Sequence, residues 1–305
     1  MAMAGSIARR DQIPRGILFM VASTAVFAVT NAIGKWEVAL YPVGEVAFFR
    51  TLFSVMVLYA AFLPRTGLTV FRTRRPGAHV KRALSQLCSM MSIFMAFKLM
   101  PLASVTAIGF AAPLFTTLLS IVILKDRVGI HRWSALVVGF VGVLVITRPG
   151  VGTFQLGALF ALVNAIMIST VAIAIRQMSL TESTQTLTMW QMTLIACFTA
   201  CLLPFGYTTP SWHDLALLAL AGVGNGTAQY WWTKALNLAP PSAVVPFNYL
   251  SLVWATFLGF AVWGDVPTAT LVVGAVIVVG SGLYILWREA VWRGRRAVAA
   301  SDRIS

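Results

Sequence analysis

Two charged residues in one apolar stretch are the side chains best suited to binding a small charged ligand. Arg50 and Glu45 both lie in the apolar run 43–63. A guanidinium binds a carboxylate through paired hydrogen bonds, and a glutamate in apolar surroundings can take up a proton or a cation. Residues five apart on a helix point about 140° away from each other, so the two do not form a bridge along one face.

Each of these residues also has a simpler interpretation. Arg50 could lock two helices together instead of anchoring a substrate carboxylate, because a deep arginine needs hydrogen-bond partners or water in either case. Glu45 lies nearer the end of the stretch and could be an interfacial residue in contact with water. The sequence leaves both alternatives open.

Uncharged polar side chains inside other apolar stretches could hydrogen-bond a ligand. The candidate binding residues, besides the two charged ones, are Asn31, Gln86, Gln191, Asn225, Gln229, Asn248 and Tyr249. The segment 222–229 places two glycines, Asn225 and Gln229 on one helical face. Such a face either lets a second helix approach closely or lines a cavity.

The patterns of common catalytic and cofactor sites are missing from the sequence. His79, His131 and His213 fall in predicted loops and form no metal-binding cluster with acidic residues. No Ser/His/Asp set or pair of carboxylates can be assembled within the apolar stretches. No glycine-rich nucleotide-binding motif precedes a Lys-Ser or Lys-Thr pair. We therefore expect no catalytic residue, no metal and no cofactor.

The composition defines the elements that must position these residues. Of 305 residues, 59% are apolar and 10% are charged, against roughly 45–50% and about 25% in soluble domains. So few charges cannot cover a soluble surface, whereas about 20 apolar residues suffice to cross a membrane as a helix. The sequence predicts an all-α integral membrane protein with ten transmembrane helices, near 16–34, 43–63, 83–99, 103–124, 134–147, 155–175, 187–205, 214–233, 242–263 and 268–287.

The basic residues predict how these helices are oriented. The net charge is +14, and most of the 23 lysines and arginines fall in the termini and in alternate loops. Only Lys35, Lys98 and Arg148 fall on the other side, and Arg50 lies within a span. The positive-inside rule then places both termini in the cytoplasm. This distribution reflects membrane topology and gives no reason to expect nucleic-acid binding.

The two halves of the chain repeat each other. A shift of 139 residues places Pro101 on Pro240 and Asp126 on Asp265, and matching span lengths accompany these identities. Residues 1–150 and 151–305 are therefore two five-helix repeats. Because five is odd, the second repeat enters the membrane from the opposite side, which gives an inverted repeat.

The repeat also relates the polar candidates to one another. A shift near 141 pairs Arg50 with Gln191, and a shift of 139 pairs Gln86 with Asn225. Corresponding positions in inverted helices converge near the middle of the membrane, so we expect a central cavity bordered by spans 1–4 and 6–9. Spans 5 and 10 are apolar and rich in valine and glycine, which suits helix packing or contacts with a second copy of the chain.

Several motifs resemble the drug/metabolite transporter superfamily, specifically ten-span proteins built from two EamA-type repeats. The resemblance covers nearly the whole chain and is carried by the segments 45–50 (EVAFFR), 112–115 (APLF), 125–128 (KDRV), 138–143 (VGFVGV) and 246–250 (PFNYL). Within the superfamily, the segment 45–50 looks most like the S-adenosylmethionine uptake branch. Riboflavin importers and many exporters share much of the pattern.

The resemblance implies a secondary transporter that moves a small organic metabolite across the bacterial inner membrane by alternating access. S-adenosylmethionine or another amino-acid-like zwitterion is the substrate it favours. The alternatives are a riboflavin importer, or an amino-acid or drug exporter of the same superfamily. A membrane-embedded lipid enzyme is the rival from another class, and the missing catalytic groups argue against it.

Overall fold

The computed structural model describes residues 12–124, 130–147, 152–178, 181–239 and 244–301, and across these ranges it is helical without a strand. The helices are α1 (Ile13–Leu40), α2 (Val43–Thr66), α3 (Pro76–Leu99), α4 (Leu102–Gly109), α5 (Ala112–Leu124), α6 (Ile130–Thr147), α7 (Gly152–Met178), α8 (Thr184–Ala200), α9 (Trp212–Leu238), α11 (Leu250–Trp263) and α12 (Ala269–Ser301). Three short 3-10 helices accompany them: η1 (Gly67–Phe71), η2 (Leu203–Phe205) and η3 (Val245–Tyr249).

The described helices follow the predicted spans one by one, with α4 and α5 as two parts of the fourth. Five segments are long and apolar enough to cross a membrane, and three shorter apolar helices lie at 133–147, 247–263 and 269–284. Helices α3 and α9 are outside both groups. These two helices carry Gln86 and Asn225, which are among the candidate binding residues. Polar residues of this kind lower the mean hydropathy of the two helices.

The fourth and ninth spans are both interrupted. Helix α4 ends at Gly109 and α5 begins at Ala112. Pro113 lacks the backbone N–H that would continue the hydrogen-bond ladder across this point. In the second half, η3 carries a proline in its first turn and leads directly into α11. Interrupted helices at matching positions of two repeats are typical of transporter binding sites.

Packing between the helices follows the twofold relation of the repeats. Helix α1 packs on α9, and its counterpart α7 packs on α3. Likewise α2 packs on α9, and its counterpart α8 packs on α3. Helices α4 and α11, which are counterparts, pack on each other. Exchanging the two halves therefore leaves the main contacts of the bundle unchanged.

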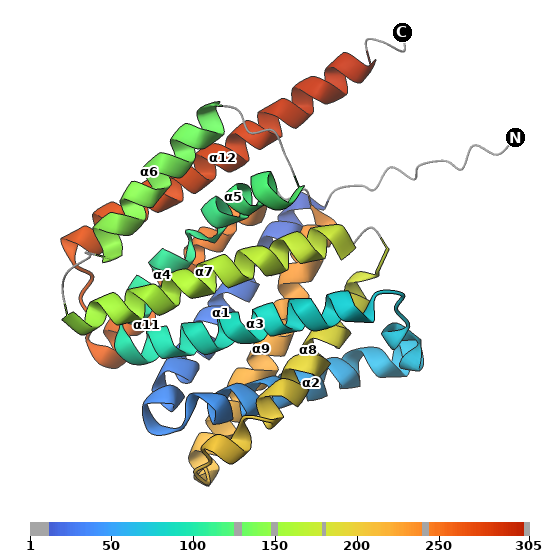
Figure 1. The fold of residues 1–305 in the computed structure, drawn as a ribbon, viewed down its shortest axis with the longest axis vertical. Helices are drawn as coiled ribbons and strands as arrows, with labels where there is room; N and C mark the ends of the chain where they lie inside the picture. Colours follow the sequence, from blue (N-terminus) through green and yellow to red (C-terminus); the bar gives the residue numbers. More distant parts are fainter. Residues whose placement is uncertain (1–11, 125–129, 148–151, 179–180, 240–243, 302–305) are drawn as a thin grey trace, which may run out of the picture.

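Helices α6 and α12 form a pair at one edge of the bundle (Figure 1). A Cβ atom at Gly274 would lie 2.8 Å from the backbone oxygen of Gly142, so only glycine permits this close crossing. These are the fifth and tenth spans, for which the sequence predicts helix packing or contacts with a second copy of the chain.

The end of the bundle that holds Leu40, Leu99 and Trp212 is named the outer end here, after the orientation that the basic residues predict. Helices α1 and α3 end there, and α9 begins there. The opposite end, where α3 begins and α9 ends, is the inner end.

Candidate functional site

Arg50 lies at the centre of a polar cluster formed by three helices. Its side chain on α2 is 8% exposed. Its Nη2 donates to the Oδ1 atom of Asn31 on α1 at 3.0 Å and to that of Asn225 on α9 at 2.9 Å. The guanidinium carbon lies 5.4 Å from the centre of the Phe94 ring on α3. Space for the guanidinium depends on Gly34, since a Cβ atom there would lie 3.2 Å from Nη1.

Close contact between α2 and α9 holds this cluster together. A Cβ atom at Gly222 would lie 2.8 Å from the backbone oxygen of Arg50, and one at Gly226 would lie 2.6 Å from Val57. The Ser54 hydroxyl lies 2.8 Å from the backbone oxygen of Gly222 and accepts from Nδ2 of Asn225 at 3.1 Å. The small-residue face of α9 therefore serves close helix approach, which was one of its two interpretations.

Among the residues that the structure describes, no acidic neighbour balances the charge of Arg50. Within the described ranges the ion pairs are Lys35–Asp265 and His213–Asp214, and none reaches this cluster. Its partners are the neutral amides of Asn31 and Asn225. Buried charges in proteins are normally paired, so an anion would complete this arrangement.

A cavity of about 210 Å³ lies next to this cluster. Helices α1, α3, α4, η3 and α11 supply its lining, which includes the polar residues Thr24, Asn31, Thr106, Asn248 and Ser251. Asn31 belongs to both features, because it lines the cavity and accepts a hydrogen bond from Arg50. The cavity also contacts Gly109, where the fourth span is interrupted. Neither α6 nor α12 contributes to its lining.

A second cavity lies at the outer end. It measures about 240 Å³, and its lining includes Pro101, Asp265 and Pro267 together with Ile146 of α6 and Leu271 of α12. Its lining residues include none of the sequence candidates, whereas the cavity beside Asn31 is also lined by Asn248.

A second buried arginine was missed by the sequence analysis. Helix α3 begins at Pro76, so His79 and Arg82 belong to the helix and not to the loop to which they were assigned. Arg82 is 4% exposed and donates to the backbone oxygen of Leu187 at 3.1 Å and to the side-chain oxygen of Gln191. The spacing 79, 82, 86 of polar residues along one helical face was the available signal.

The two residue pairs that the repeat relates each form a hydrogen bond between two helices. Arg50 and Asn225 join α2 to α9, whereas Gln191 donates from Nε2 to Oε1 of Gln86 at 3.1 Å and joins α8 to α3. The expectation that all four residues share one region stays a prediction. Within the described part of the chain, no hydrogen bond links the first pair to the second.

The remaining candidates lie in three places. Glu45 is buried near the outer end, where its Oε2 accepts from the backbone N–H of Thr208 at 2.9 Å. The ring of Tyr249 packs on Phe110 with 4.7 Å between the centroids. Gln229 is half-buried on α9 and lines neither cavity.

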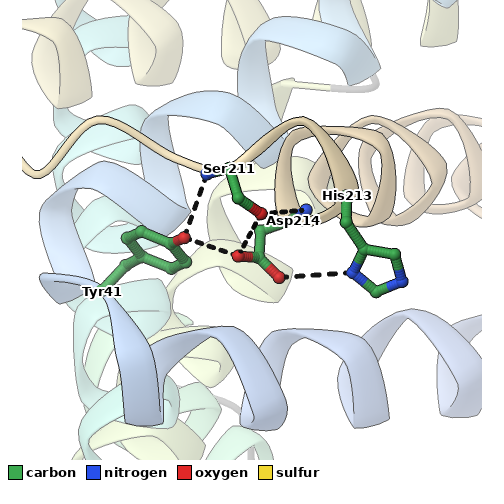
Figure 2. Close-up of polar contacts among 4 residues, drawn as sticks. All are labelled: Tyr41, Ser211, His213 and Asp214. Carbon is green, nitrogen blue, oxygen red and sulfur yellow. Dashed lines mark hydrogen bonds and ion pairs between the residues drawn. The ribbon is translucent and has the colours of Figure 1, made fainter.

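Polar contacts tie α1 to α9 at the outer end (Figure 2). Tyr41 donates to Oδ2 of Asp214 at 2.6 Å, and this hydrogen bond raises the pKa of Tyr41. Ser211 caps α9 by accepting from the backbone N–H of Asp214 at 3.2 Å. His213 contacts Asp214 at 3.5 Å, and the serine hydroxyl donates to Asp214 at 2.7 Å, so the set lacks the serine–histidine contact of a hydrolase.

An ion pair closes the neighbouring part of the outer end. Nζ of Lys35 on α1 lies 3.3 Å from Oδ2 of Asp265, in the connection between α11 and α12. The same ammonium lies 4.7 Å from the centre of the Trp263 ring. The outer ends of α1, α9 and α11 are therefore held together by polar contacts.

Long apolar helices, twofold packing of two halves and interrupted helices beside a cavity define a polytopic membrane protein of the transporter class. The chain belongs to the EamA-like transporter family, which matches residues 14–148 and 155–287. It is thus a transporter built of two repeats, and not an enzyme.

Curated relatives of several transport functions match most of the chain. An S-adenosylmethionine uptake transporter of Rickettsia prowazekii is 28% identical over 90% of this chain and 93% of its own length. A riboflavin transporter of Rhizobium johnstonii is 27% identical over 90% of this chain and 91% of its own length. The pseudopaline exporter CntI of Pseudomonas aeruginosa is 25% identical over 88% of this chain and 95% of its own length.

A solved crystal structure shares the fold. It aligns with a TM-score of 0.63 and 21% identity over 88% of this chain and 96% of that chain. At this identity the likeness concerns the fold alone.

Proposed function

We propose that this protein is a secondary transporter for a small metabolite that carries a carboxylate, with S-adenosylmethionine or another amino-acid-like zwitterion as substrate. It works in the bacterial inner membrane with both termini in the cytoplasm. The observation that carries the proposal is the buried guanidinium of Arg50, which has two amide partners and no acidic one among the described residues.

The geometry supports a substrate carboxylate as the missing anion. Nη2 of Arg50 is engaged by Asn31 and Asn225, and neither amide oxygen carries a formal charge. A carboxylate in the adjacent cavity would reach the guanidinium past Asn31, which lines that cavity. Charge-assisted hydrogen bonds are roughly twice as strong as neutral ones, so such an anion would compete with the amides.

Relatives favour the same substrate class. Four of the relatives, from four Rickettsia species, are named as S-adenosylmethionine uptake transporters, at 27–29% identity. The riboflavin transporters are similarly related, at 27% identity. Riboflavin has no carboxylate, so a requirement for Arg50 separates the two substrates.

Alternating access fits the twofold packing of the bundle. The halves 1–150 and 151–305 contact each other through pairs of helices that the repeat relates, since α1 packs on α9 and α7 packs on α3. Contacts that close the outer end can therefore have equivalents, related by the twofold axis, that close the inner end. Because the outer end is held by Lys35–Asp265 and Tyr41–Asp214, the structure fits a conformation closed to the outside.

Uptake by purified protein in liposomes tests the proposal. Radiolabelled S-adenosylmethionine should accumulate, and Arg50→Lys should raise the apparent KM about tenfold, or about 1.4 kcal/mol, because lysine keeps the charge but loses the planar fork. Arg50→Gln should abolish uptake of the carboxylate substrate and spare decarboxylated S-adenosylmethionine. Lys98→Gln, at an exposed site on α3, is the matched control for loss of one positive charge.

Two results would contradict the proposal. If well-folded Arg50→Gln transports the intact substrate with normal affinity, Arg50 does not bind the carboxylate. If riboflavin accumulates and S-adenosylmethionine does not, the zwitterion assignment is wrong.

A further inference from the structure

A buried carboxyl group near the outer end has no place in the site described above. Glu37 lies on α1, three residues before the helix ends at Leu40. Its side chain is 0% exposed, and neither carboxyl oxygen has a hydrogen-bond partner in the described part of the chain. Glu37 is not among the candidates from the sequence, and it lies beyond the predicted span 16–34.

The neighbours of Glu37 do not compensate a negative charge. Asp214, at the start of α9, acts on Glu37 as a charge of the same sign. Tyr41, one turn further along the chain, donates its hydroxyl to Asp214 and not to Glu37. Lys35, on the same helix, is engaged with Asp265 at 3.3 Å.

The other described elements at this end supply no cation for Glu37 either. Glu45 on α2 is itself buried, with Oε2 bound to the Thr208 N–H and Oε1 without a partner. His213 on α9 is exposed and contacts Asp214 at 3.5 Å. Lys98, near the end of α3, is exposed. The charged groups that face this region from α2 and α9 are thus acidic, apart from an exposed histidine.

Burial and a neighbouring carboxylate both favour the protonated form of such a carboxyl over the ionised form. An ionised carboxylate without hydrogen bonds or water pays a large desolvation cost, and the adjacent Asp214 adds repulsion. Separation of α1 from α9 would admit water to Glu37 and remove both penalties. The closed and open conformations of the outer end therefore differ in how strongly they bind a proton.

We propose that Glu37 is a proton-binding site that controls the outer opening of this transporter: it holds a proton while α1 and α9 are closed and releases it to external water when they separate. The inference rests on the proposed alternating-access function and adds its coupling ligand. No covalent bond other than the carboxyl O–H changes, and water accepts the proton. Because the closed form binds one proton more, rising pH favours opening.

Distance measurements between two spin labels test this proposal without any substrate. The labels are attached at Leu40→Cys on α1 and Trp212→Cys on α9, both at exposed positions of the outer end. The three native cysteines, Cys88, Cys197 and Cys201, are replaced by serine. The full-length protein is reconstituted in lipid, and the distance distribution is recorded across a pH series.

The expected result is a growing long-distance population as pH rises. For release of one proton, the opening equilibrium constant increases by up to about tenfold per pH unit. Glu37→Gln, which mimics the protonated group, should stay closed at every pH. Infrared spectra should show a protonated-carboxyl band that is absent in Glu37→Gln and present in Glu45→Gln. His213→Gln should keep the pH dependence.

Four outcomes would overturn the proposal. The first is an unchanged pH dependence in Glu37→Gln, and the second is its loss in His213→Gln. The third is opening that follows sodium concentration at fixed pH, which would assign the site to a metal cation. If the outer end opens with substrate but never with pH, the proton site fails while alternating access stands.

Discussion

The rings of Phe110 and Tyr249 pack together with 4.7 Å between their centroids, although they belong to different halves of the chain. The repeat shift of 139 residues that pairs Gln86 with Asn225 also places position 110 on position 249. Two counterpart residues in contact must lie near the twofold axis that relates the halves. Both flank interruptions of their spans, so the axis passes beside the cavity.

Tyr249→Ala should destabilise the protein by at least about 1 kcal/mol, because an aromatic pair contributes about 0.5–1.5 kcal/mol beyond simple burial. Thermal unfolding in detergent measures the effect. Tyr249→Phe keeps the ring and should unfold at the normal temperature. Equal losses in both variants would show that the hydroxyl, and not the ring contact, matters.

Asn225→Asp should block transport of a carboxylate substrate without lowering thermal stability. The new carboxylate would lie about 2.9 Å from Nη2 of Arg50 and neutralise the cation from within the protein. We expect uptake of S-adenosylmethionine to fall at least tenfold. Gln86→Glu, at the counterpart position, is the matched control and should retain more activity. Normal uptake in Asn225→Asp would exclude Arg50 as the anchor.

Gly222→Ala should force α2 and α9 apart. Its methyl group would lie 2.8 Å from the Arg50 backbone oxygen and closer still to Phe53. Overpacking of this kind costs about 1–3 kcal/mol, which a lower Tm would report. Gly280→Ala on α12 is the control, because no atom lies within 4 Å of the added methyl group. A tolerated Gly222→Ala would contradict the close packing of α2 on α9.

Reporter fusions should establish the orientation of the chain. A fusion after residue 70 or at the C-terminus should be active only in the cytoplasm, and one near residue 209 only outside. The reason is the concentration of lysine and arginine in the termini and alternate loops. A C-terminus found outside would overturn the inverted repeat.

Tyr41→Phe should loosen the outer end at neutral pH, because it removes the hydrogen bond to Asp214. The pKa of Tyr41 is raised by that bond, so the phenol keeps its proton through neutral pH and the bond is lost only as pH rises through this elevated value. Spin labels at positions 40 and 212 should therefore report more of the open form at every pH below that range. Because Glu37 is untouched, the slope with pH should not change.

The sequence by itself determined the helical membrane architecture and the repeat. Hydrophobic stretches long enough to cross a bilayer are a local property, so their places follow from hydropathy, and the described helices lie where those stretches predict. Repeat alignment likewise predicted that Arg50 and Asn225 correspond to Gln191 and Gln86. Both pairs are hydrogen-bonded in the structure.

The tertiary structure decided which polar residues are buried and what they contact. Arg82 and Glu37 lie near helix ends, where sequence cannot distinguish a hydrated side chain from one enclosed by a neighbouring helix. Each is buried because α3 packs on α8 and α1 packs on α9, and the rotation of a helix about its axis depends on such packing. The hydropathy pattern indicates the depth of a residue along the membrane normal. The hydrogen-bond and packing partners of that residue depend on contacts between helices that are distant in sequence.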